Sequence, residues 1–142
     1  MGLAVLSAVL LLGGQRVLTG RLLAAFAVTG LVEFAMKLWL PQVAMPEETV
    51  RSTDPSPIVE VAYSYPYPSG HMLRSVILLG AVYALWPNKL VRAAILVFLV
   101  GMAVSRVYLG VHWASDVLGG ALLGAIGVVW AFGSISARSG PY

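Results

Sequence analysis

Five apolar blocks, separated by short breaks, limit what this chain can fold into more than any other feature of its sequence. Only 11% of the residues are charged, against roughly 25% in an average soluble domain. The apolar residues also come in runs rather than at the period of an amphipathic surface helix. The runs cover residues 2–14, 22–40, 72–86, 91–110 and 113–133. We therefore expect an all-α integral membrane protein, a bundle of about five transmembrane helices, or six if a first helix is missing from this chain.

The blocks differ in whether they are long enough to cross a bilayer. The last two reach the roughly 20 residues that a spanning helix needs. The third is shorter, and the second is long enough but carries Glu33 and Lys37 near one end. Residues 2–14 would form only about 20 Å of helix. They lack the basic leading region and the cleavage site of a signal peptide, so we expect a short membrane helix there.

Small residues in the last block indicate how that helix packs. Its glycines recur at near-helical spacing at Gly119, Gly120, Gly124 and Gly127. Small residues let transmembrane helices approach closely. We expect them to pack against other helices of the same bundle, with a dimer face as the alternative.

The one long loop, residues 41–68, separates the second block from the third. It holds six of the eight prolines and four of the six acidic residues, and proline at this density prevents a helix. By length the chain is a single domain. We therefore treat residues 1–142 as one membrane-embedded domain with a proline-rich extracytoplasmic loop.

Basic residues set the expected orientation in the membrane. One end of the five predicted helices carries Arg16, Arg21, Lys89, Arg92 and Arg138. The positive-inside rule makes that end cytoplasmic, so the opposite end, which carries both histidines, faces outward. With five crossings Met1 also lies outside, which predicts that a first helix is absent from this chain.

Two short segments place the only two histidines beside strong anion-binding groups. Pro68-Ser69-Gly70-His71 opens the third block, and Ser105-Arg106 precedes His112 and Asp116. Residues four apart lie on one face of a helix, so a carboxylate would orient the His112 imidazole near an arginine. Such an arrangement can make a nucleophile for a phosphoryl group.

Each of these polar groups also has a purely structural interpretation. The His112 pair is compatible with a helix cap, and Arg106 with a snorkelling side chain at a helix end. Ser69 is compatible with an ordinary N-cap, and Lys37 with an i,i+4 ion pair to Glu33. All of them, however, fall at the same end of separate predicted helices, and ionisable groups at membrane depth are costly and usually functional. We therefore expect a shared site there, to which the backbone N–H groups that begin the third block add a phosphate cradle.

Composition excludes several classes of function. The chain has no cysteine, which removes disulfides and thiolate catalysis, and its two histidines do not have the spacing of a zinc site. The nine basic residues form no stripe of the kind that nucleic acid binding requires. We expect no metal, no cofactor and no nucleic acid partner, and the sequence leaves the oligomeric state open.

Together, Lys37, Pro68-Ser69-Gly70-His71 and Ser105-Arg106-x5-His112-x3-Asp116 resemble the three-part signature of the type 2 phosphatidic acid phosphatase family, the lipid phosphate phosphatases. The resemblance covers the chain from about Lys37 to the C-terminus. It implies a metal-independent membrane hydrolase in which His112 attacks phosphorus and forms a phosphohistidine. It also implies that Asp116 holds the other ring nitrogen, and that His71 protonates the leaving oxygen and then activates water. The implied phosphate-binding groups are Lys37, Ser69, the Gly70 amide and Arg106.

This chain departs from the family pattern at one position. The family's first motif runs Lys-x6-Arg-Pro, and counting from Lys37 the arginine position holds Ala44. One phosphate-binding guanidinium is therefore missing from the motif. Arg51, in the proline-rich loop, and Arg74, one turn after His71, are the candidate replacements, and a site that works with less positive charge is the third alternative.

The resemblance also narrows the expected substrate. It implies a polyprenyl (undecaprenyl) diphosphate or a related lipid phosphate as the partner of the site, in a bacterial or archaeal cell membrane. A phosphatidylglycerophosphate or phosphatidic acid phosphatase and a lipid phosphotransferase are alternatives. A non-catalytic lipid-phosphate-binding membrane protein is the alternative from another class, and the altered first motif is its support.

Overall fold

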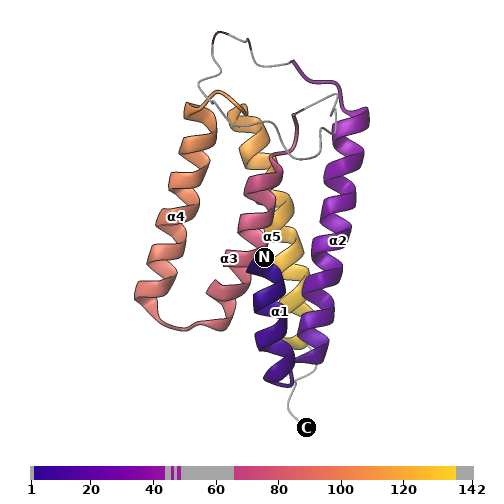
Figure 1. Cartoon of the computed structure of the whole chain (residues 1–142), viewed down its shortest axis with the longest axis vertical. Coiled ribbons are helices and arrows are strands. Elements are labelled where there is room, and N and C mark those ends of the chain that lie inside the picture. The colour runs from indigo at the N-terminus through magenta and orange to yellow at the C-terminus, as the bar shows by residue number, and fades with distance from the viewer. Residues whose placement is uncertain (1, 44–45, 47, 49–65, 137–142) are drawn as a thin grey trace.

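The computed structural model describes residues 2–43, 46, 48 and 66–136. Within them the chain forms five α-helices and no strand (Figure 1). The helices are α1 (Gly2–Leu12), α2 (Arg16–Trp39), α3 (Gly70–Leu85), α4 (Lys89–Tyr108) and α5 (Ala114–Ser136). This part of the chain confirms the expected all-α class and the five helices. Most of the 41–68 loop, including Ala44 and Arg51, lies outside the described residues.

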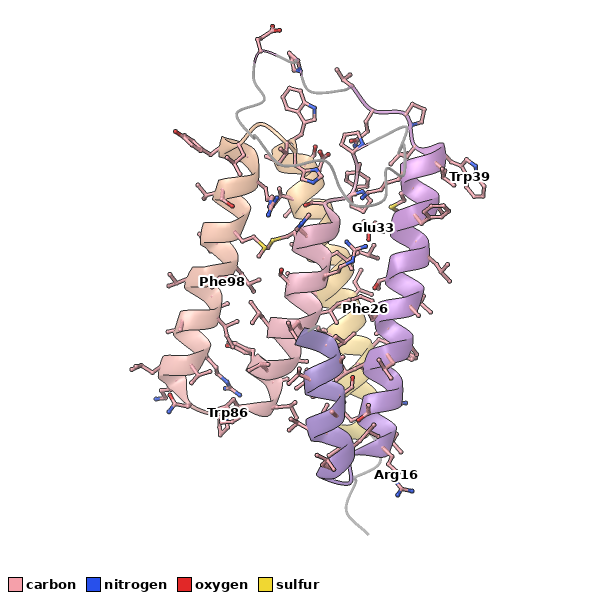
Figure 2. The ribbon with its side chains drawn as sticks, in the orientation of Figure 1. Arg16, Phe26, Glu33, Trp39, Trp86 and Phe98 are labelled. Carbon is pink, nitrogen blue, oxygen red and sulfur yellow. The ribbon has the colours of Figure 1, made fainter. Side chains whose placement is uncertain are left out.

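The helices form a bundle in which α3 packs against all four other helices. Helix α5 packs against α2, α3 and α4, and α1 packs against α2 and α3. The end of α2, the start of α3, the end of α4 and the start of α5 all lie at one end of the bundle (Figure 1). We call this the motif end, because the three sequence motifs fall on these helix termini. Arg16 and Trp86 lie at the opposite end (Figure 2).

Three of the helices are long and apolar enough to cross a membrane, judged by length and composition. They are α2, α4 and the Ala114–Gly133 part of α5. The other two, α1 and α3, are apolar but have only 11 and 16 residues, which correspond to about 17 and 24 Å of helix. Helix α2 begins at Arg16 rather than at residue 22, because polar residues end an apolar block without ending a helix.

A short turn joins α3 to α4 where the sequence predicted a break. The Asn88 side chain caps α4 by accepting the Leu90 and Val91 N–H groups at 2.8 and 3.3 Å. Arg92 donates its Nε to the carbonyl oxygens of Tyr83 and Trp86, at 3.1 and 2.9 Å. These contacts fix the reversal that brings the end of α4 back to the motif end.

Glycines on α5 allow it to approach α3 closely. A Cβ on Gly120 would overlap the Ser69 carbonyl oxygen, and a Cβ on Gly124 would lie 2.8 Å from the carbonyl oxygen of Leu73. The small residues therefore serve packing inside the bundle at these positions, as the sequence predicted.

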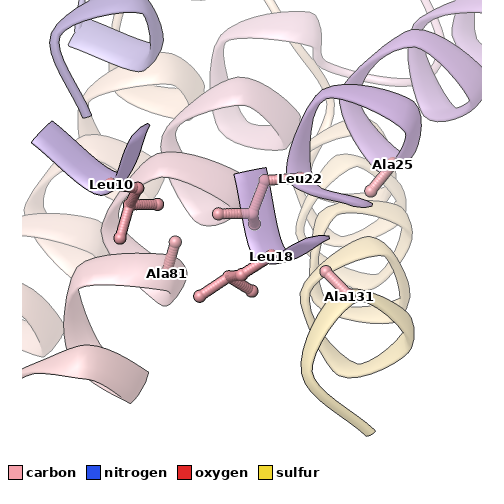
Figure 3. Packing of buried hydrophobic residues seen from close by; sticks show 6 residues of the cluster. All are labelled: Leu10, Leu18, Leu22, Ala25, Ala81 and Ala131. Atoms are coloured by element: carbon pink, nitrogen blue, oxygen red, sulfur yellow. The ribbon is translucent and has the colours of Figure 1, made fainter. Parts of the chain in front are cut away.

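Buried apolar side chains extend along the bundle: Met72, Leu73, Ile77 and Val117 lie nearer the motif end, and a cluster of others lies toward the opposite end. This cluster comes from α1, α2, α3 and α5 (Figure 3). Its members are Leu10, Leu18, Leu22, Ala25, Ala81 and Ala131. Helix α4 adds only Ile95 to the buried residues, and large apolar side chains such as Val97 are exposed along it. An exposed apolar surface of this extent is typical of contact with lipid rather than water.

Candidate active site

His112 and Asp116 meet at the start of α5. His112 lies in the connection before the helix, Asp116 lies fully buried in its first turn, and His112 Nδ1 is 3.4 Å from Asp116 Oδ2. The same Oδ2 accepts the Trp113 N–H at 2.9 Å, as in a capping box. The 3.4 Å separation is longer than a good hydrogen bond, and such catalytic pairs often tighten only when substrate is bound. The carboxylate therefore caps the helix and faces the imidazole at the same time.

Charges from three parts of the chain act on His112. Burial lowers the pKa of His112 below its ordinary value of 6.5, and the neighbouring Asp116 opposes this by raising the pKa. Lys37 and His71 lie near enough to lower the pKa of His112 further. The structure thus brings all three motifs together, and at neutral pH it favours the neutral imidazole, the form that can attack phosphorus.

The start of α3 is held directly against the start of α5. The Ser69 N–H donates to the Asp116 carbonyl oxygen at 2.9 Å, and Ser69 is fully buried. Ser69 occupies the N-cap position, but its side chain makes no cap hydrogen bond. Its Oγ is buried without a hydrogen-bond partner among the described residues. The side chain therefore does not form the ordinary N-cap, and the first N–H groups of α3 begin beside the His112 pair, where a helix N-terminus favours an anion.

Lys37 belongs to a chain of ion pairs that links α2 to α3. Its Nζ lies 2.8 Å from Glu33 Oε1, the i,i+4 pair that the sequence predicted. The second oxygen, Oε2, accepts a hydrogen bond from Arg74 NH2 at 3.0 Å. Glu33 lies between the two helices, toward the motif end (Figure 2). Of the two arginines expected to replace the missing guanidinium, Arg74 is thus in contact with Glu33, and Arg51 lies outside the described residues.

Arg106 lies in the last turn of α4, on the other side of the site. Its side chain is half-buried, and its Nε is buried without a hydrogen-bond partner in the part of the chain that the structure describes. A snorkelling arginine would keep its guanidinium in contact with water or headgroups. Of the Arg106 nitrogens only the Nε is buried and unpaired, and a buried donor left unpaired costs about 1–3 kcal/mol, so this Nε is open to an anionic ligand.

One contact at the site had no counterpart in the sequence reasoning. The Trp113 indole Nε1 donates to the Val43 carbonyl oxygen at 3.0 Å. It ties the segment after α2 to the connection that carries His112. The only signal in the sequence was that Trp113 directly follows His112.

The groups at the motif end suit an anionic ligand. Lysine, arginine and backbone N–H groups lie near a neutral imidazole, and the described residues contain no group of three or more His, Asp or Glu side chains that could hold a metal ion. Phosphoryl transfer depends mainly on positioning and on neutralising charge. These residue types supply both.

Comparison with models of protein families identifies the source of this arrangement. The model described as the PAP2 superfamily matches residues 4–139. The chain belongs to the PAP2 superfamily. PAP2 superfamily members are phosphatases and phosphotransferases that act on phosphate esters, often those of lipids. Neither the curated proteins nor the solved structures gave a significant match.

Proposed function

We propose that this PAP2 superfamily member is an integral membrane phosphatase that hydrolyses a lipid phosphate through a phosphohistidine on His112. The observation that carries the proposal is the convergence on one partly buried imidazole of Asp116, at 3.4 Å, and of Lys37 and His71, which lie near enough to lower the pKa of His112. A single pair of this kind has a structural explanation as a helix cap. Four ionisable groups from three segments do not.

In the first step His112 is the nucleophile. Because Nδ1 faces Asp116, we assign the proton to Nδ1 and the lone pair to Nε2. Nε2 attacks phosphorus, the bond from phosphorus to the leaving oxygen breaks, and His71 donates a proton to that oxygen. The Asp116 carboxylate stabilises the positive charge that develops on the ring, as a carboxylate does for a catalytic histidine.

In the second step water replaces His112 on phosphorus. His71, now neutral, accepts a proton from the water, the P–N bond breaks, and inorganic phosphate leaves. Lys37, Arg106, the Ser69 hydroxyl and the Gly70 amide bind the phosphoryl oxygens in both steps. The hydroxyl of Ser69 and the Nε of Arg106 support this assignment, since both are buried and lack a hydrogen-bond partner among the described residues.

An apolar groove between α4 and α5 supports a lipid substrate. It has a volume of about 670 Å³ and is lined by Ala103, Val104, Val107, Tyr108, Ala114, Val117 and Leu118. Two lining residues, Ala114 and Val117, lie on the same short segment as His112 and Asp116. A lipid whose hydrocarbon chain lies in this groove therefore has its phosphate headgroup at the site. We propose a polyprenyl diphosphate as the substrate, with other lipid phosphates, or transfer to a lipid acceptor, as alternatives.

Phosphate release in detergent tests the proposed activity. The full chain is expected to release phosphate from undecaprenyl diphosphate, phosphatidylglycerophosphate or phosphatidic acid, and His112→Ala is expected to release none. Release by His112→Ala at the parent rate contradicts the proposal. If the parent releases nothing from any of the three but binds orthovanadate, the chain is a lipid-phosphate binder rather than an enzyme.

Substitutions in two grooves test where the lipid chain lies. Ala103→Phe fills the α4–α5 groove, and Ala24→Phe fills a groove of about 360 Å³ between α2 and α5. Ala103→Phe should lower kcat/KM on a polyprenyl diphosphate about tenfold, the equivalent of about two methylene groups losing apolar contact. It should leave a short water-soluble phosphate ester unaffected. If Ala24→Phe instead lowers kcat/KM on the polyprenyl diphosphate and spares the short ester, the lipid chain lies in the groove between α2 and α5.

Labelling tests the proposed orientation, because the chain has no cysteine of its own. Trp39, at the motif end, and Lys89, at the other end, are both exposed. A membrane-impermeant maleimide added to intact cells should label Trp39→Cys and spare Lys89→Cys. The reverse pattern would place the site on the cytoplasmic face.

A further inference from the structure

Glu33 is a carboxylate buried in the middle of the proposed phosphate-binding groups. Its side chain is 4% exposed, on a helix that is mostly apolar. Burying a carboxylate is costly unless it is paired and hydrogen-bonded. Glu33 meets that requirement with both oxygens, since Oε1 pairs with Lys37 and Oε2 with Arg74.

The position of Glu33 is fixed from the side of α3 as well. Gly70 is the first residue of α3, and a Cβ on Gly70 would overlap Glu33 Oε1 and lie 2.5 Å from Arg74 NH1. The carboxylate therefore packs directly against the backbone that begins the phosphate cradle. Glycine at this position is what lets an acidic side chain approach so closely.

We propose that Glu33 is a positioning residue of the phosphate site, and that Arg74 acts on the bound phosphate through Glu33 and Lys37 rather than by touching it. This inference rests on the proposed function. Arg74 NH2 is already bonded to the carboxylate, which in turn holds the Lys37 ammonium. The arginine absent at position 44 is thus replaced by two linked ion pairs across α2 and α3, which we call the relay, and not by a second side chain that touches the phosphate.

Fixing the carboxylate in place gives the relay its effect. Arg74 on Oε2 and the close approach of Gly70 hold the Glu33 side chain in one position, and Glu33 Oε1 in turn holds the Lys37 ammonium at 2.8 Å. Loss of either contact lets the Lys37 side chain leave this position. Arg74 therefore sets the position of Lys37 without leaving α3.

A double-mutant cycle on the full chain separates the relay from direct contact. Glu33→Gln, Arg74→Met and the double variant are compared by their KM and kcat on a lipid phosphate and by their dissociation constants for orthovanadate. Each single change should raise KM and the vanadate dissociation constant about tenfold, the scale of coupling within a contacting charge network, with kcat changed much less. The double variant should be no weaker than Glu33→Gln alone, because Arg74 has lost its route to Lys37.

Two controls keep the result interpretable. Arg74→Lys retains the charge and should restore most of the affinity. Arg16→Met removes an exposed arginine at the opposite end of the bundle and should leave KM unchanged. If Glu33→Gln does not fold, a double-mutant cycle of Arg74→Met with Lys37→Met measures the coupling between Arg74 and Lys37 instead. The Arg74 side chain is 51% exposed, so its loss leaves no buried cavity.

Two outcomes overturn the inference. If the Arg74→Met effect is as large in the Glu33→Gln background as in the parent, Arg74 contacts phosphate directly. If the variants lower the melting temperature without changing KM or vanadate affinity, the three side chains only stabilise the fold. A parent chain that hydrolyses nothing would instead refute the proposed function, and the vanadate cycle would still decide the inference.

Discussion

Gly120 couples the packing of the bundle to the geometry of the site, so Gly120→Ala tests both together. A Cβ at this position would overlap the Ser69 carbonyl oxygen and lie 3.3 Å from the Leu73 backbone nitrogen. Both neighbours are backbone atoms that cannot rotate away, and the Ser69 carbonyl already accepts the Leu73 N–H at 3.0 Å. The start of α3 must therefore move away from α5.

The size of the effect follows from this displacement. Overpacking of a close contact costs about 1–3 kcal/mol, and at about 2–4 °C per kcal/mol the melting temperature should fall by about 2–12 °C. A shift of about 1 Å in a group that positions a substrate can lower the rate about 100-fold. We therefore expect kcat/KM to fall more steeply than the fraction of folded protein.

Gly101→Ala is the matched control for this substitution. Gly101 lies in the middle of α4, and a Cβ there would have no atom within 4 Å. Alanine also favours a helix over glycine by about 1 kcal/mol, so this variant should be at least as stable and as active as the parent. Melting in detergent and phosphate release are measured on both variants. The account of α3–α5 packing is refuted if Gly120→Ala matches Gly101→Ala in both measurements.

Three further substitutions test individual groups of the site. Asp116→Asn removes the charge that raises the pKa of His112, so the acid limb of the pH profile of kcat/KM should move to lower pH. By analogy with a catalytic triad, kcat should fall by about 10⁴. An acid limb that moves to higher pH contradicts the assignment. Ser69→Ala should leave the melting temperature unchanged, because the Ser69 Oγ has no partner among the described residues. It should weaken vanadate binding about 10- to 100-fold, because that hydroxyl binds the charged ligand. An unchanged vanadate affinity would show that Ser69 does not bind phosphate. Trp113→Phe loses the 3.0 Å hydrogen bond to the Val43 carbonyl and should cost about 1 kcal/mol of stability, measured by denaturant titration. An unchanged midpoint would show that this bond does not stabilise the segment after α2.

The sequence predicted the helices because apolar blocks are a local signal. The breaks at Gly13-Gly14 and at Trp86-Pro87-Asn88 fall between helices in the structure. The ends were predicted less well, since α2 begins at Arg16 in a polar stretch that an apolar block leaves out. His112 was expected on a helix with Asp116, but it precedes the helix, because the carboxylate caps α5 at Trp113.

Local spacing also predicted part of the candidate site. The pairs Glu33–Lys37 and His112–Asp116 are both four residues apart, and the structure places each pair in contact. The bond from Arg74 to Glu33 joins residues 41 positions apart. It depends on how α2 and α3 pack, and no periodicity within either helix indicates it.

Isolation of the covalent intermediate tests the central claim most directly. A lipid phosphate labelled with ³²P is mixed with the full chain, the reaction is quenched in alkali within the first turnovers, and the labelled peptide is sequenced by mass spectrometry. The account predicts an acid-labile, alkali-stable phosphate on His112, absent from His112→Ala and accumulating in His71→Ala when a good leaving group replaces the lipid. Label on His71, or phosphate release by the parent with no protein-bound label at any quench time, would contradict it.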